Sequence, residues 1–165
     1  MLLAACAVPG FLLSSKDLEF ELTARIAMKV RDDAASGNIA WRHSALEDEL
    51  LLTSPLGQGL ARIMRTGEEV TLTMQDGREF RAANAESLTE KALGFRLPLE
   101  GLADWVRARP APGLAFTRKD AEGRLARIEQ FGWTIEYLEY AGQLPSRLNL
   151  TYPGVQLRLA ISGWK

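Results

Sequence analysis

The chain has 165 residues, of which 47% are hydrophobic and 25% charged, and its formal net charge is −1. This length and composition are typical of one globular domain with a sizeable core, and they exclude a disordered or fibrous chain. The near-balance of charge disfavours broad binding to nucleic acid, and no apolar run from Phe11 onward is long enough to span a membrane as a helix.

The first 17 residues contain the only cysteine, Cys6, and precede every predicted folded element. The stretch Leu3-Ala4-Ala5-Cys6 resembles a bacterial lipobox, in which the cysteine is lipidated on its thiol and becomes the new N-terminus. We therefore expect residues 1–17 to be a lipobox and tether, with Cys6 as the lipidation site. No charged segment and no full apolar segment of about 7 to 15 residues precedes the motif. Either the signal sequence begins upstream of Met1, which we expect, or it is absent.

Residues 18–31 alternate between apolar and polar side chains, which predicts a long strand with one dry face and one wet face. Asp76-Gly77 is a typical two-residue hairpin turn, and Ser54-Pro55-Leu56-Gly57 has the residues of a tight turn with a leucine at its tip. Further strands are predicted at about 37–44, 48–53, 60–65, 69–75 and 78–82.

The pattern changes to helical between residues 84 and 109. Asn84 is a good N-cap and Gly94 a good C-terminal residue for a helix over about 85–93. A second helix is predicted from Leu99 until Pro110 and Pro112 end it, because apolar residues recur there at helical spacing. Strands are predicted again at about 114–119, 124–131, 133–140, 146–152 and 155–164.

These elements predict a mainly β fold, an open antiparallel half-barrel of about eleven strands with a two-helix lid inserted mid-chain at about 84–109. Residues 18–165 are expected to form a single domain. A sheet with one apolar face must curve so that this face is buried, and the helices are therefore expected on its concave side. They either fill the interior as core or cover a cavity, and the pattern leaves both possibilities open.

No catalytic site, metal site or cofactor is predicted. His43 is the only histidine and shares the dry face with Ile39 and Trp41, which favours a structural role. No serine lies in a nucleophile-elbow motif and no phosphate-binding loop is present. The acidic run Glu47-Asp48-Glu49 is expected to face solvent. The same is expected of four arginines, for which a basic patch on adjacent strands is the alternative, namely Arg62, Arg65, Arg78 and Arg81.

Several landmarks occur in the order and spacing of one family. They are Arg25-Ile26-Ala27, Trp41, the stretch from Leu50 to Gly57, Leu97-Pro98-Leu99 with Trp105, Gln130-Phe131-Gly132-Trp133 with Tyr137, Leu144-Pro145, and Trp164. Over roughly residues 20–164 the chain resembles the LolB family of outer-membrane lipoproteins. That family receives other lipoproteins from the periplasmic carrier LolA and inserts them into the outer membrane.

The resemblance implies a half-barrel with a hydrophobic cavity for acyl chains and a loop that contacts the membrane, here Pro55, Leu56 and Gly57. The implied partners are a LolA carrier, lipoprotein substrates and outer-membrane lipids. The implied location is the periplasmic face of the outer membrane with Cys6 as the anchor, and the chain is expected to be a monomer. The residues expected to line the cavity are Phe20, Leu22, Ile26, Met28, Leu88, Leu99, Leu102 and Trp105.

Two other functions fit the same pattern. A soluble periplasmic carrier of the same fold would lack the lipidated cysteine, and a non-transporting structural lipoprotein would have a filled interior. An enzyme is the least favoured alternative, because no residue pattern suggests a reaction.

Overall fold

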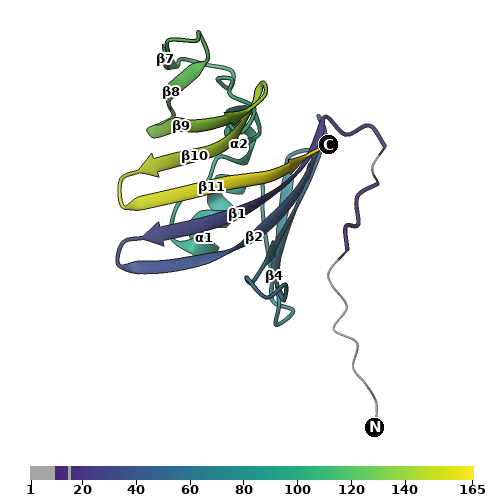
Figure 1. The fold of residues 1–165 in the computed structure, drawn as a ribbon. Coiled ribbons are helices and arrows are strands. Elements are labelled where there is room, and N and C mark those ends of the chain that lie inside the picture. The colour runs from purple at the N-terminus through teal and green to yellow at the C-terminus, as the bar shows by residue number, and fades with distance from the viewer. Residues whose placement is uncertain (1–9, 15) are drawn as a thin grey trace.

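The computed structural model describes residues 10–165 with the exception of Ser15, so Cys6 and the lipobox lie outside the described residues. Eleven antiparallel strands form one open sheet, which confirms the predicted mainly β half-barrel (Figure 1). The strands are β1 (Phe20–Val30), β2 (Asp33–His43), β3 (Glu47–Thr53), β4 (Gly59–Thr66), β5 (Glu69–Met74), β6 (Glu79–Ala82), β7 (Phe116–Lys119), β8 (Leu125–Gln130), β9 (Trp133–Ala141), β10 (Leu144–Tyr152) and β11 (Val155–Trp164).

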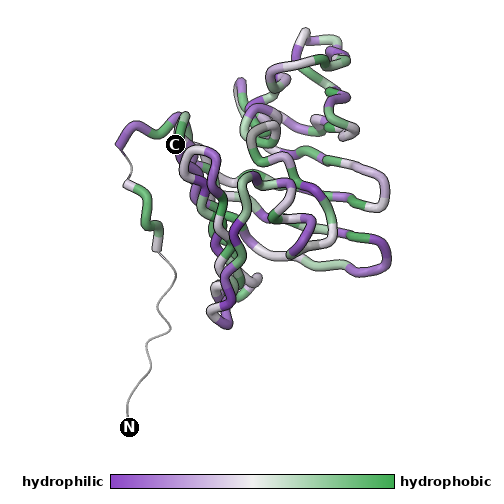
Figure 2. The backbone as a smooth tube through the Cα atoms, turned by 180° about the vertical axis from the view of Figure 1, so that it is seen from behind, coloured by the Kyte–Doolittle hydropathy of each residue, from purple (hydrophilic) through white to green (hydrophobic). Residues whose placement is uncertain are grey.

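The strand order is β6-β5-β4-β3-β2-β1-β11-β10-β9-β8-β7. The first and last strands are therefore neighbours at the centre of the sheet, where Ile26 is paired with Leu159. All other neighbouring strands are consecutive in the chain, so the sheet consists of two meanders joined at β1 and β11. Hydrophobic and hydrophilic residues succeed one another along the strands, which gives the sheet one apolar and one polar face (Figure 2).

Two helices, α1 (Ala85–Leu93) and α2 (Leu99–Trp105), connect the edge strands β6 and β7 and lie on the concave side of the sheet (Figure 1). Asn84 caps α1, because its side-chain oxygen accepts a hydrogen bond from the Ser87 N–H at 2.8 Å. Gly94 ends α1 in the left-handed conformation at φ 79°. The positions of both caps agree with the sequence prediction.

Helix α2 is shorter than predicted, because it ends at Trp105 and not at Pro110. Ala108 adopts a left-handed φ of 54°, and its N–H donates to the Trp105 carbonyl. The Arg109 N–H donates to the Asp104 carbonyl, which completes a Schellman motif. Glycine usually occupies the left-handed position of this motif, so the alanine gave no sequence signal for the end of the helix.

The core of the molecule is continuous, but its two halves are packed differently. Beneath β8, β9 and β10 the side chain of Trp105 fills the interior, and its ring centroid lies 6.4 Å from that of Trp133. Gln130 accepts a hydrogen bond from Trp105 Nε1 at 2.9 Å and exchanges two further hydrogen bonds with the backbone of Ala111. These buried contacts fix the C-terminal end of α2 to one half of the sheet.

Candidate lipid-binding site

The other half of the interior contains a cavity of about 740 Å³ between α2, the segment before it and the inner faces of β1–β5 and β11. This volume lies within the range of about 300–1,000 Å³ that is usual for sites of small ligands. The lining is almost entirely apolar. Its hydrophobic side chains include Leu22, Ile26, Met28, Ile39, Trp41, Leu50, Leu52, Leu60, Ile63, Leu72, Met74, Phe95, Leu97, Leu102, Val106, Leu157 and Leu159.

The polar residues of the cavity wall lie toward one end of the sheet. Gln75 and Asp76 lie in the turn between β5 and β6, and Ser36 lies near the start of β2. The Gln75 N–H donates to the Leu60 carbonyl at 2.9 Å, so this turn adjoins the start of β4. We infer that the cavity opens at the end of the sheet that carries the β3–β4 and β5–β6 turns.

Four of the eight residues expected to line the cavity do so. Leu22, Ile26 and Met28 contribute from β1, and Leu102 contributes from α2. Met28 and Ile26 are only partly buried, as suits the wall of a cavity.

The other four expected residues are buried but lie outside the cavity wall. Phe20 packs near the far end of β1, where its ring centroid is 5.0 Å from that of Trp41 and 4.8 Å from that of His43. Trp105 fills the opposite half of the interior, and Leu88 and Leu99 belong to the packed core. The apolar residues of β2–β5 are the larger part of the wall, and their alternation was the available signal for them.

The β3–β4 turn holds Leu56 away from the rest of the molecule. The Gly57 N–H donates to the Ser54 carbonyl at 2.9 Å, and the Ser54 N–H donates to the Gln58 carbonyl at 2.8 Å. Gly57 has a φ of 86°, which a residue with a side chain rarely adopts. Leu56 at the tip of this fixed turn is 92% exposed, more than any other large hydrophobic residue in the described part of the chain.

A buried ionic cluster lies at the other end of β3 and corrects the predicted exposure of two residues. Asp48 is 1% exposed and Arg65 is 7% exposed, although both were expected to face solvent. The Asp48 carboxylate accepts a hydrogen bond from Trp41 Nε1 at 2.7 Å, lies 2.6 Å from His43 Nδ1 and pairs with Arg65 Nε. His43 therefore has a structural role, and the cluster closes this end of the interior.

Glu49 is the second acidic residue with a wrongly predicted exposure, because it is completely buried. Its side chain is on the outer face of β3, opposite the cavity-lining Leu50, and forms an ion pair with Arg62 at 3.1 Å. Glu47, the first residue of the acidic run, is half-buried, and Arg78 and Arg81 are exposed as predicted.

A second ionic contact joins the end of α2 to the chain before β1. Arg107 Nη1 donates to the Glu19 carboxylate at 2.8 Å. This hydrogen bond, together with the nearby charges of His43 and Arg109, holds the pKa of Glu19 below its usual range. Because the carboxylate form is favoured in the folded state, the contact contributes its full stability above the pKa of an unfolded glutamate. That stability is lost as the pH falls through the lower pKa of Glu19 in the folded state.

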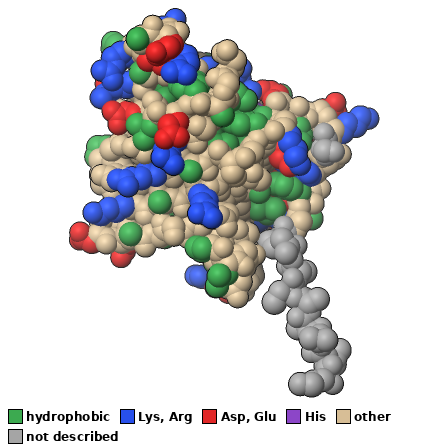
Figure 3. Space-filling view, viewed as in Figure 1, with side chains coloured by type: hydrophobic (Ala, Val, Ile, Leu, Met, Phe, Trp, Pro, Cys, Tyr) green, Lys and Arg blue, Asp and Glu red, His purple; other side chains and the backbone are tan. Residues whose placement is uncertain are grey.

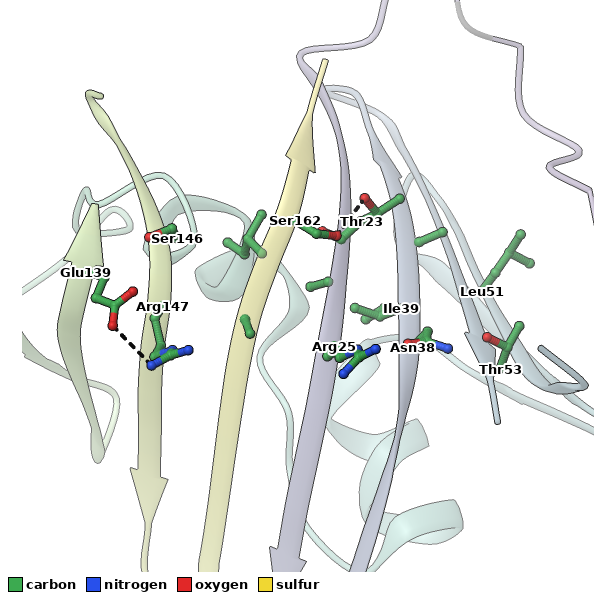
Figure 4. A pocket seen from close by; sticks show the side chains of 14 residues that line it. Thr23, Arg25, Asn38, Ile39, Leu51, Thr53, Glu139, Ser146, Arg147 and Ser162 are labelled. Carbon is green, nitrogen blue, oxygen red and sulfur yellow. Dashed lines mark hydrogen bonds and ion pairs between the residues drawn. The ribbon is translucent and has the colours of Figure 1, made fainter. Parts of the chain in front are cut away.

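A shallower depression on the outer face of the sheet differs in character from the cavity. Its labelled side chains are mostly polar, and Arg147 forms an ion pair with Glu139 at 3.0 Å (Figure 4). Lys and Arg side chains stand apart from one another across this face (Figure 3). Three charged side chains, Arg25, Glu139 and Arg147, line this depression, whereas Asp76 is the only charged one among the described residues of the inner cavity wall, so the inner cavity is the candidate site for an apolar ligand.

The described residues, 10–14 and 16–165, contain no candidate for two other kinds of site. None of the helices described there is long and apolar enough to cross a membrane. Within the same residues, no group of three or more His, Cys, Asp or Glu side chains is placed to hold a metal ion.

An open antiparallel sheet that encloses an apolar cavity beneath a helical cover defines the class of half-barrel proteins with an apolar interior. The fold is similar to that of a LolA superfamily protein from Nitrosomonas europaea, with a TM-score of 0.53 at 12% sequence identity, over 92% of this chain and 87% of that one. The family model described as outer membrane lipoprotein LolB matches residues 18–164. The chain belongs to the LolB family.

Relatives named outer-membrane lipoprotein LolB agree with this assignment. One from Thiobacillus denitrificans is 42% identical over 146 residues, which cover 87% of this chain and 78% of the relative. Another from Azoarcus sp. is 36% identical over 173 residues, which cover 99% of this chain and 90% of the relative. Membership of this lipoprotein family also identifies the chain as a protein that is not an enzyme, as the sequence predicted.

Proposed function

We propose that this protein is a receptor anchored to the periplasmic face of the outer membrane through Cys6. It accepts lipoproteins from a LolA-type carrier by binding their acyl chains in the cavity, and it inserts them into the outer membrane. The observation that carries the proposal is that the polar wall residues of an apolar cavity and an exposed leucine on a fixed turn lie at the same end of the sheet.

Direct transfer between two cavities is favoured by the cost of exposing an acyl chain to water. At about 0.8 kcal/mol per CH₂, a chain of about sixteen carbons amounts to roughly 12 kcal/mol. A cavity that faces the membrane lets the chain move from protein to bilayer without that exposure. Leu56 contributes only about 1.5 to 3 kcal/mol when it enters lipid. This energy orients the cavity mouth on the bilayer, while the lipid on Cys6 provides the attachment.

Helix α2 and the segment before it are the proposed lid of the cavity. Leu97, Leu102 and Val106 supply its apolar underside. Because buried hydrogen bonds fix the end of α2 to β8 and to the segment before β7, we expect opening to move the residues between Gly94 and Leu102 instead.

The two alternative functions predict different behaviour. A soluble carrier would not be lipidated on Cys6, whereas the receptor incorporates palmitate there in cells that express the full precursor. A structural lipoprotein would not bind fluorescent fatty acids, whereas the cavity described above favours their binding.

The proposal is tested by following a labelled lipoprotein from the LolA-type carrier to the protein and then to liposomes. Leu56→Glu is expected to leave folding and acceptance intact and to reduce delivery to liposomes at least tenfold, because a charged residue does not enter the bilayer. Leu46→Glu is the matched control, since Leu46 is also exposed, at 69%, but lies in the turn at the opposite end of β3. Loss of acceptance in Leu56→Glu, or equal loss of delivery in both variants, would contradict the proposal.

A further inference from the structure

The outer face of the sheet carries a buried carboxylate that the proposed function does not use. Glu49 is 0% exposed, although the neighbouring Leu50 points to the cavity and Glu49 points to the opposite, outer face. A carboxylate is rarely buried without partners, because its charge loses the solvation of water. The partners of Glu49 come from a segment 36 and 37 residues earlier in the chain.

Two consecutive backbone N–H groups bind this carboxylate. The Leu12 N–H donates to both oxygens of Glu49 at 2.9 Å, and the Leu13 N–H donates to Oε2 at 2.6 Å. Hydrogen bonds to an ionised acceptor are stronger than those between neutral groups. The ion pair with Arg62 at 3.1 Å completes the surroundings of the charge.

Two arginines hold the carbonyl groups of the same segment. Arg42 Nη1 donates to the Leu13 carbonyl at 2.6 Å, and Arg62 Nη2 donates to the Gly10 carbonyl at 2.7 Å. The Arg42 guanidinium also lies 4.1 Å from the centroid of the Phe11 ring. Three side chains therefore bind the backbone of residues 10–13. We call these side chains, Arg42, Glu49 and Arg62, the tether clamp.

The pairing of the strands gives the direction in which the segment crosses the sheet. Glu49 is paired with Arg42, and both contact Leu13. Arg62 is paired with Leu51 and contacts Gly10, so the segment advances toward the β3–β4 turn as it approaches Gly10. Arg62 is three residues from Gly59, where that turn ends and β4 begins, which is roughly 10 Å along a strand.

The position of the clamp limits the reach of the lipidated cysteine. Gly10 lies four positions after Cys6, and these four steps span at most about 14 Å when the chain is fully extended. This reach is comparable with the distance from Arg62 to the β3–β4 turn. Released from the clamp, the whole stretch before Phe20 would be a free linker, and Cys6 would no longer be restricted to this end of the sheet.

We propose that the tether clamp orients the protein on the membrane, so that the lipid on Cys6, Leu56 and the cavity mouth all meet the bilayer from one end of the sheet. This inference rests on the proposed function for its consequence, but the clamp itself is a property of the folded chain. Binding of residues 10–13 shortens the stretch of chain between Cys6 and the sheet. A linker that was free as far as Phe20 would allow the cavity to face away from the lipid.

The test uses Glu49→Gln in the full-length lipidated protein on liposomes. Glu49→Gln removes the charge and keeps nearly the same volume. Hydrogen exchange of the Leu12 and Leu13 amides is expected to become roughly tenfold faster or more, because hydrogen bonds to a charged group are lost. Delivery of lipoprotein to the bilayer is expected to fall by a similar factor, while acceptance from the carrier stays at the level of the unchanged protein.

Two further variants keep the test decisive. Glu47→Gln is the matched control on the same strand and face, and it is expected to change neither measurement. Arg62→Gln removes the contact with Gly10 by a different route and is expected to reproduce the loss of delivery. This variant carries the test if Glu49→Gln proves unstable in thermal unfolding.

The outcomes separate the clamp from the proposed function. Unchanged amide exchange in both Glu49→Gln and Arg62→Gln overturns the clamp, and faster exchange with unchanged delivery overturns its role in orientation. If the unchanged protein delivers no lipoprotein, the proposed function fails, and the exchange measurement still decides whether residues 10–13 are bound.

Discussion

At the scale of single residues, Asp48 is a buried carboxylate with partners from three other side chains. It satisfies the Trp41 indole N–H, contacts His43 and neutralises Arg65, all in the interior. The Arg65 guanidinium also donates to the carbonyl groups of Leu46, Gly67 and Ser44, so the cluster fastens the two turns at this end of β3 and β4. Removal of the carboxylate would leave a buried guanidinium without its counter-charge.

Asp48→Ala is therefore expected to lower the free energy of unfolding by about 3 to 5 kcal/mol, the usual effect of removing one partner from a buried ion pair. Urea denaturation followed by circular dichroism measures this change. Glu69→Ala is the control, because Glu69 forms an exposed ion pair with Arg81 and its loss is expected to cost less than about 1 kcal/mol. Similar losses in the two variants would show that the buried cluster contributes no special stability.

The acidic run shows what sequence can and cannot predict about single residues. Asp48 has the same parity as Leu50 and Leu52 in the strand, so the alternation predicts the inner face for it, whereas its charge favours solvent. Glu49 is different, because its position on the outer face follows from the pattern and its burial does not. The segment that covers it is distant in sequence, and no local pattern reveals that contact.

At the scale of elements, a single strand or helix contributes side chains both to the packed core and to the cavity wall. The inner face of β1 begins with Phe20 in the packed end and continues to Ile26 and Met28 in the cavity. Helix α2 directs Leu102 to the cavity and Trp105 to the filled half. The strands and their faces were predictable from alternation. The division between cavity and core was not, because both need apolar residues at the same positions.

Ile26→Gln tests the cavity at the level of one strand. An amide in the apolar wall lacks a partner, which costs about 1 to 3 kcal/mol and weakens binding of a fluorescent fatty acid roughly five- to 150-fold. Ala27→Gln is the matched control, because Ala27 is the next residue along β1 and is exposed on the outer face. Equal affinities in the two variants, measured by fluorescence titration, would exclude Ile26 from the binding surface.

At the scale of the whole molecule, the structure combines a filled half with a hollow one. The filled half supplies a rigid support, since Ile128, Ile135, Leu148 and Leu150 are fully buried there. The hollow half lacks the packing that such side chains provide, so a ligand that fills it restores contacts missing in the empty protein. Occupancy of the cavity is therefore expected to stabilise the entire fold.

Palmitate at about 100 times its dissociation constant is expected to raise the free energy of unfolding by about 2.7 kcal/mol. For a chain of this length the corresponding increase in Tm is about 5 to 10 °C. Differential scanning calorimetry measures the shift, and butyrate serves as the control because its short chain gains little from burial. An unchanged Tm with bound palmitate would mean that palmitate binds the unfolded chain as tightly as the folded protein, which would contradict a binding site formed by the fold.

The pairing of β1 with β11 at the middle of the sheet has a consequence for the order in which the protein is made. The ribosome produces β1 first and β11 last among the strands. The pairing of β1 with β11, which includes Leu22 with Trp164, therefore forms only after the last strand has been synthesised. Until then, β1 presents an open edge to other chains, and neither meander has its neighbour. A nascent chain that stalls between Tyr152 and Val155 would therefore be prone to aggregate, although ten of the eleven strands are complete.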